Sequence, residues 1–119
     1  MAGIHDMARD LGNALARTDE YQALKRAIEA ADNDRELVEV RNELQRLEQE
    51  LEGQLRAGQE PDEEFKTAYY AASEKLQGMP AFQRLVAAQS NFEKVMYKVN
   101  ETVAKGIEEG AQSRIIISS

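Results

Sequence analysis

The sequence predicts an all-α protein, a helical bundle with two long antiparallel helices and shorter N-terminal helices. Residues that favour helices, such as Ala, Leu, Glu and Lys, are abundant, and charged residues make up 31% of the 119 residues. Apolar side chains recur at steps of three and four along most of the chain, which is helical spacing. The chain has two prolines and no tryptophan, a composition that leaves little for a sheet sandwich.

The length indicates a single helical domain, residues 1–119. Its helices are expected at about 4–17, 18–32, 34–56, 61–77 and 81–105. For the tail 111–119, which includes three consecutive isoleucines, three alternatives stay open: it packs on the body, pairs as a short strand, or is flexible.

Capping residues separate the two N-terminal helices. Ile4, Met7 and Leu11 give the first helix its apolar stripe, although Gly12 weakens it by about 1 kcal/mol relative to Ala. Thr18 is a good N-cap for the second helix, because its side-chain oxygen can accept from a backbone N–H. The stripe of that helix comprises Tyr21, Leu24, Ile28 and Ala31. We expect Asp34 to cap the third helix in the same way.

The third helix carries the most regular pattern in the chain, a seam of apolar side chains about three heptads long. These residues are Leu37, Val40, Leu44, Leu47 and Leu51. A helix over 34–56 would be about 34 Å long. Ala57 and Gly58 end it, and Pro61 suits the first turn of the fourth helix.

The fifth helix follows the break Gly78-Met79-Pro80 and is the second long helix of the prediction. Its stripe includes Phe92, Val95 and Val99. Two long seams are more apolar surface than the shorter helices can cover, so we expect a homodimer or a higher even oligomer. The seam residues of both long helices are therefore candidates for the core or the oligomer interface.

Some apolar residues lie off the main stripes and define a possible partner surface. On a helical wheel Tyr70 lies about 140° from Phe65, and Val86 and Tyr97 share a flank of the fifth helix. A broader core, or single exposed apolar residues, would account for them. A contact surface for partner proteins would also account for them, since aromatic residues are enriched in interfaces.

The composition disfavours several classes of partner and compartment. The net charge of −7, with acidic residues near each basic one, disfavours direct binding of nucleic acid or of an anionic membrane. Cysteine is absent, which excludes disulfides and thiolate ligands. No run of about 20 apolar residues is present to span a membrane, and the N-terminus does not resemble a signal peptide. We expect a cytoplasmic protein.

Residues that could support chemistry are few. His5 is the only histidine, and it has no converging partners beyond Asp6 and Asp10 in the sequence. The acidic run at 60–64 lacks the order of a calcium loop and is better explained as charge at a helix N-terminus. No nucleophile elbow, P-loop or dinucleotide fingerprint occurs. We therefore expect no catalytic residue, no metal and no cofactor, and the protein is not predicted to be an enzyme.

Several packing motifs resemble the YlbF/YmcA family of small bacterial helical proteins, including its YheA-type members. The resemblance covers about 14–107 and begins at "ALARTDEYQALKRAIEAADND". It continues through "LQRLEQEL" and "GMPAFQRL" to "NFEKVMYKVNETVAKGI". It implies an all-helical protein that self-associates through its long helices and regulates competence, sporulation or biofilm formation by assembling with partners, including an RNA-processing system.

Some members of the family hold iron–sulfur clusters on cysteine ligands, a feature that this cysteine-free chain does not share. The function expected from the sequence is thus a non-enzymatic, oligomeric interaction module of regulatory type. The alternative is a structural or chaperone-like helical adaptor, which would be favoured if the seam from Leu37 to Leu51 were exposed and unpaired.

Overall fold

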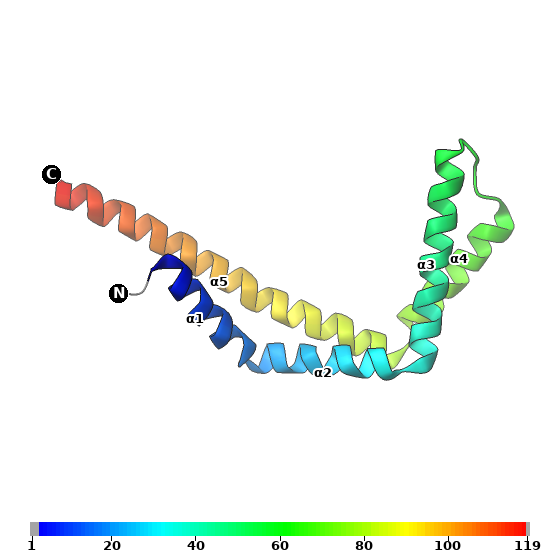
Figure 1. Cartoon of the computed structure of the whole chain (residues 1–119), viewed down its shortest axis with the longest axis horizontal. Helices are drawn as coiled ribbons and strands as arrows, with labels where there is room; N and C mark the ends of the chain where they lie inside the picture. The colour runs from blue at the N-terminus through cyan, green and yellow to red at the C-terminus, as the bar shows by residue number, and fades with distance from the viewer. Residues whose placement is uncertain (1–2, 119) are drawn as a thin grey trace.

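The structure is a computed structural model, and it describes residues 3–118. It contains five helices and, within that range, no strand (Figure 1), so the all-α fold class is confirmed. The helices are α1 (Ile4–Ala16), α2 (Asp19–Asn33), α3 (Arg35–Arg56), α4 (Glu63–Gln77) and α5 (Pro80–Ser118).

Side-chain caps start three of these helices. Thr18 Oγ1 accepts from the N–H of Tyr21 at 3.1 Å, and Asp34 Oδ1 accepts from the N–H of Leu37 at 3.1 Å. Both caps were predicted from the sequence and are confirmed. Asp62 caps α4 in the same manner, with 2.8 Å between its Oδ1 and the N–H donor. Each cap satisfies a backbone donor that the first helical turn leaves without a partner.

The fifth helix is longer than the predicted range 81–105, because the structure continues it from Pro80 to Ser118. Gly106 and Gly110 were expected to mark its fraying end. A glycine weakens a helix by only about 1 kcal/mol, and no proline follows to remove a backbone donor. Of the tail 111–119, the part up to Ser118 is thus helical in backbone, and residue 119 lies outside the described residues.

The helices form two arms joined at an angle (Figure 1). In one arm α2 packs antiparallel on α5, with α1 beyond it, and in the other arm α3 and α4 form a hairpin. The molecule measures 70 × 36 × 22 Å, with a radius of gyration of 22.0 Å. A compact domain of this length has a radius of gyration of about 13 Å, so this subunit is open and elongated.

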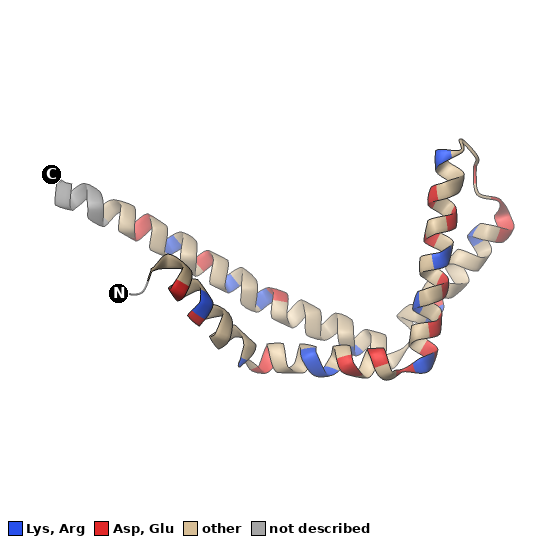
Figure 2. Ribbon diagram, in the orientation of Figure 1, with Lys and Arg blue, Asp and Glu red and all other residues tan. Residues whose placement is uncertain are grey.

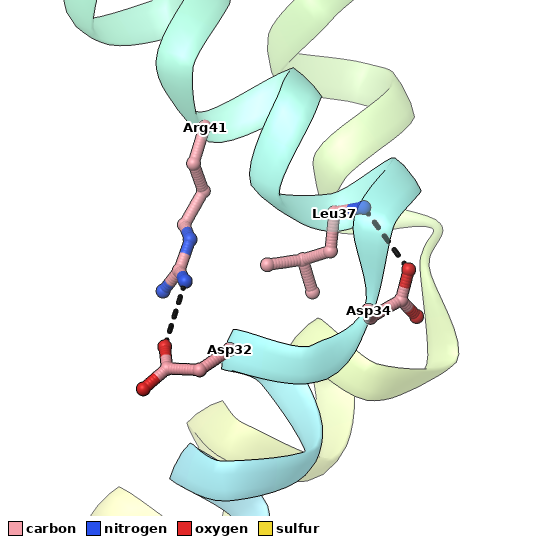
Figure 3. A network of polar contacts seen from close by, with 4 residues as sticks. All are labelled: Asp32, Asp34, Leu37 and Arg41. Atoms are coloured by element: carbon pink, nitrogen blue, oxygen red, sulfur yellow. Dashed lines mark hydrogen bonds and ion pairs between the residues drawn. The ribbon is translucent and has the colours of Figure 1, made fainter.

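The hinge between the arms is the direct succession of α2 and α3 around Asp34. Figure 3 shows Arg41 reaching back from α3 to Asp32 at the end of α2, with 3.0 Å between Nη2 and Oδ1. Leu37 is completely buried at the same point, and Ala31 of α2 is buried with it. A cap, a surface ion pair and a small apolar cluster therefore meet where α3 leaves α2, and the buried cluster is the part that holds the direction of α3.

The hydrophobic core extends from this hinge into the α3–α4 hairpin. Its buried members are Ala31, Leu37, Val40, Leu44, Leu47, Ala72, Met79 and Leu85. The two long helices do not pack along one another. Each has a shorter partner, since α3 packs on α4 and α5 packs on α2, where Tyr21 meets Phe92 edge to face at 5.4 Å between ring centroids.

Candidate interaction surfaces

The seam on α3 lies inside the subunit. Leu37, Val40, Leu44 and Leu47 are buried, and Leu51 is half-buried near the end of the helix. Partly buried side chains of α4, such as Phe65, pack against this seam. The seam is therefore the core of the α3–α4 arm, and it is not the free apolar edge from which an oligomer was expected.

The seam on α5 is only partly covered. Phe92, Val95 and Val99 are half-buried beside α2. Val95 and Val99 border an open hollow of about 550 Å³ together with Glu20, at the start of α2. Coverage by α2 thus ends near Val99, and the rest of α5 continues beyond it (Figure 1).

Tyr70 is exposed on the outside of α4, with 67% of its surface accessible. Its ring contacts that of Tyr69 edge to face, with centroids 6.3 Å apart. Together with Leu51, Pro61 and Phe65 these tyrosines line a shallow hollow of about 200 Å³ at the free end of the hairpin. The arrangement offers an aromatic ring and a shallow apolar depression to a partner.

Val86 and Tyr97 are also exposed, Tyr97 to 72%. They lie on α5, eleven positions apart, so they share one flank of that helix. Val86 borders a hollow of about 490 Å³ with Phe82 and Gln77. Tyr70 belongs to the other arm (Figure 1), so the three residues of the predicted partner surface form two separate patches.

Sequence reasoning missed a further uncovered apolar area, which lies on α1 and on the part of α5 beyond α2. On α1 no residue is buried, and Ile4, Met7 and Leu11 are all exposed, Ile4 to 81%. Val103 and Ile107 on α5 are exposed as well, Ile107 to 69%. The three–four spacing of these residues was visible in the sequence, but spacing does not reveal whether another helix covers the stripe.

The exposed area of the whole chain is correspondingly large. The chain exposes 9476 Å². A compact folded protein of 13.4 kDa exposes about 6,500 Å², so the excess is about 3,000 Å². A standard interface takes about 800 Å² from each partner. The subunit therefore exposes more surface than one such interface would cover.

Acidic and basic residues alternate along both arms (Figure 2). Several pairs bridge one helical turn, such as Arg46 with Glu50 and Lys105 with Glu101. Among the described residues no three His, Cys, Asp or Glu side chains gather to hold a metal ion. His5 is exposed on α1. None of the helices in the described part of the chain is both long and apolar enough to cross a membrane.

The family model described as "Control of competence regulator ComK, YlbF/YmcA" matches residues 4–108, most of the chain. The chain belongs to the YlbF/YmcA family. The resemblance noted in the sequence is thereby confirmed.

Two curated relatives span nearly the same length. A UPF0342 protein of Limosilactobacillus reuteri is 26% identical over 110 residues, which is 92% of this chain and 89% of the relative. A UPF0342 protein of Streptococcus mutans is 24% identical over 109 residues, covering 86% of this chain and 96% of the relative. Neither description states an activity.

A solved structure supports the fold. The protein of unknown function (DUF964) from Bacillus stearothermophilus aligns with a TM-score of 0.62, at 22% identity, over 89% of this chain and 93% of that one. At this level of identity the likeness concerns the fold alone.

Proposed function

We propose that this protein is a non-enzymatic, cytoplasmic interaction module that self-associates and acts in regulation by presenting helix faces to partner proteins. The observation that carries the proposal is the open subunit, with about 3,000 Å² more exposed surface than a compact protein of its mass. Much of the uncovered apolar surface lies in stripes on α1 and α5, and uncovered stripes of this kind are typical of interaction sites.

The regulatory part of the proposal rests on the family. The description of the matching family model refers to control of a competence regulator. The open, elongated subunit is suited to a protein that works by assembling with others. Tyr70 in one arm, and Val86 with Tyr97 in the other, would be the anchors for partner proteins. Large exposed rings of this kind contribute strongly to binding when a partner covers them.

The alternative function is a structural or chaperone-like adaptor. It required an exposed, unpaired seam along α3 that could hold varied unfolded clients. Leu37, Val40, Leu44 and Leu47 are instead buried beside α4, which favours the regulatory module over this alternative. A failure to suppress aggregation of an unfolded client protein is therefore expected.

Self-association is tested by measuring the mass in solution at micromolar concentration. We expect light scattering to give twice the chain mass of 13.4 kDa or a higher even multiple. A mass of one chain across the micromolar range would contradict the proposal, because the apolar stripes would then be stable in water without a partner.

Partner binding is tested with Tyr97→Asp and Tyr70→Asp in pull-downs from the native cell, each compared with the unchanged chain. We expect helicity and self-association to be retained, while each variant loses at least one captured protein. Thr67→Asp is the matched control, since it adds the same charge at another exposed position of α4. Unfolding of both tyrosine variants would show that these rings are structural, and would end the proposed partner surface.

A further inference from the structure

The apolar stripe of α1 needs a cover that its own chain does not supply. α1 is 13 residues long, and an isolated helix of that length is marginal in water. Its main contact is with α2, the next helix in the chain, and it has no buried residue. Packing of its apolar face would provide the missing stability, so the exposure of Ile4, Met7 and Leu11 marks a docking face.

The far part of α5 presents a matching stripe. Counting 100° per residue, Val103 and Ile107 lie on the face of α5 on which Leu85 is buried and Phe92 meets Tyr21 of α2. α5 has 39 residues and α2 has 15, lengths of about 58 and 22 Å, so this face continues where α2 has ended. Apart from the adjacent residues and backbone of α5 itself, no atom lies within 4 Å of where a Cβ would stand on Gly106 or Gly110, so the surface there is open.

The turn between α1 and α2 explains why the chain does not cover the stripe itself. Thr18 Oγ1 donates to the Leu15 carbonyl at 2.7 Å while accepting from the N–H of Tyr21. Gln22 Nε2 donates to the Ala16 carbonyl at 2.8 Å, a second link across the same turn. These bonds fix the direction of α1. Although α1 and the far part of α5 belong to one arm (Figure 1), the apolar side chains of both remain exposed.

From these observations we infer that α1 of one copy packs on the Val103–Ile107 face of α5 in a second copy, and that the contact is reciprocal. The two free arm ends would then form a four-helix arrangement with two α1 and two α5 helices. This inference rests on the proposed self-association and names the surfaces that make it. The stripes fit in length, because Val103 to Ile107 spans four steps, or about 6 Å, and lies within the seven steps, or about 10 Å, from Ile4 to Leu11.

A second copy is the occupant that the exposed area favours. The excess of about 3,000 Å² is more than the roughly 800 Å² that each partner gives to a standard interface. A two-fold contact also uses both stripes at once, since each copy supplies one α1 and one α5. A single kind of partner, a second copy, would therefore cover the exposed stripes of both α1 and α5.

Because the chain has no cysteine, only the cysteines introduced by substitution can form a disulfide. Met7→Cys chains are mixed with ¹⁵N-labelled Ile107→Cys chains at micromolar concentration, and the mixture is oxidised mildly. We expect mass spectrometry to find disulfides that join a labelled to an unlabelled chain, at least tenfold more than with Arg9→Cys replacing Met7→Cys. Arg9 is exposed on the other side of α1 and serves as the control. Val103→Cys is paired with Met7→Cys in the same way.

A double variant, Met7→Cys with Ile107→Cys, shows whether α1 contacts α5 of a second copy or α5 of its own chain. We expect disulfide-linked dimers on a non-reducing gel. A disulfide that forms only within one chain would overturn the inference, since α1 would then swing onto its own α5.

A second measurement avoids cross-linking. Ile107→Asp should raise the dissociation constant of the dimer at least tenfold in sedimentation experiments, with unchanged helicity by circular dichroism. Lys105→Ala lowers the net charge by the same one unit on the opposite side of α5, and it should leave the constant within twofold.

The outcomes separate this inference from the proposed function. A dimeric wild-type protein without the mixed disulfide, and without an effect of Ile107→Asp, would overturn the α1–α5 contact and leave self-association standing. A wild-type protein with the mass of one chain would overturn both.

Discussion

The two arms of the molecule are built from the same kind of amphipathic helix, but the apolar stripe is buried in one arm and largely exposed in the other. In the α3–α4 arm the apolar seam of α3 faces α4, and four of its five members are buried. In the α1–α2–α5 arm, α2 covers only the first part of α5, and the stripe of α1 has no cover. The difference lies in length and connection. α4 comes back along α3 after a loop, whereas α5 is longer than the α2 that covers it.

Gly58 makes the return of α4 possible. Its φ of +74° lies in the left-handed region that glycine adopts without strain, and it follows Ala57, the C-cap of α3. The chain then passes Pro61 and starts α4 at the Asp62 cap. At the other arm, the turn between α1 and α2 has only Arg17 and Thr18, and it directs α1 away from a packed position on α5.

The largest expected effect concerns the closed arm. Leu37→Ala removes a large side chain that is completely buried at the hinge, and should lower the free energy of unfolding by about 2–5 kcal/mol. Urea denaturation at a fixed protein concentration measures this loss. Leu55→Ala, at an exposed position of the same helix, should cost about 0.5 kcal/mol or less. Equal losses at the two positions would contradict the core described for this arm.

A smaller effect is expected at the turn that directs α1. Thr18→Ala removes the acceptor for the N–H of Tyr21 and should lower the free energy of unfolding by about 1 kcal/mol. Self-association should weaken as well, because α1 is then less well oriented for a second copy. Thr18→Ser keeps the hydroxyl and serves as the control. Unchanged stability and unchanged association with alanine would show that this turn does not hold α1.

The smallest effect is expected for the ion pair at the hinge. Asp32→Asn weakens the contact with Arg41, which lies on the surface, and should change the free energy of unfolding by about 0.5 kcal/mol or less. The difference from wild type should vanish at about 1 M salt, where charges are screened within about 3 Å. A loss above 2 kcal/mol that persists in salt would show that this pair, rather than buried Leu37, fixes the angle between the arms.

Several features of the fold could be predicted from the sequence because their causes are local. The caps at Thr18 and Asp34 depend on a side chain and a backbone N–H three positions away. The full length of α5 was not predicted, since Gly106 and Gly110 were interpreted as an end when they only weaken the helix.

The interaction surfaces were predicted less completely. Tyr70 and Tyr97 were singled out because they lie off the stripes, and both are exposed. The stripe of α1 was interpreted only as the apolar face of a helix, and Ile107 lies beyond the predicted end of the fifth helix at 105. Nothing in their spacing distinguishes a face covered by a neighbour from one without a neighbour.

By itself, the sequence determined where helices form and which side of each is apolar, since both depend on contacts within one or two helical turns. Only the tertiary structure decided which apolar sides meet. Val40 and Ile107 both belong to stripes with steps of three and four, yet one is buried and the other exposed. Helix lengths and the direction of each turn set that outcome, because a stripe is buried only where another helix reaches it.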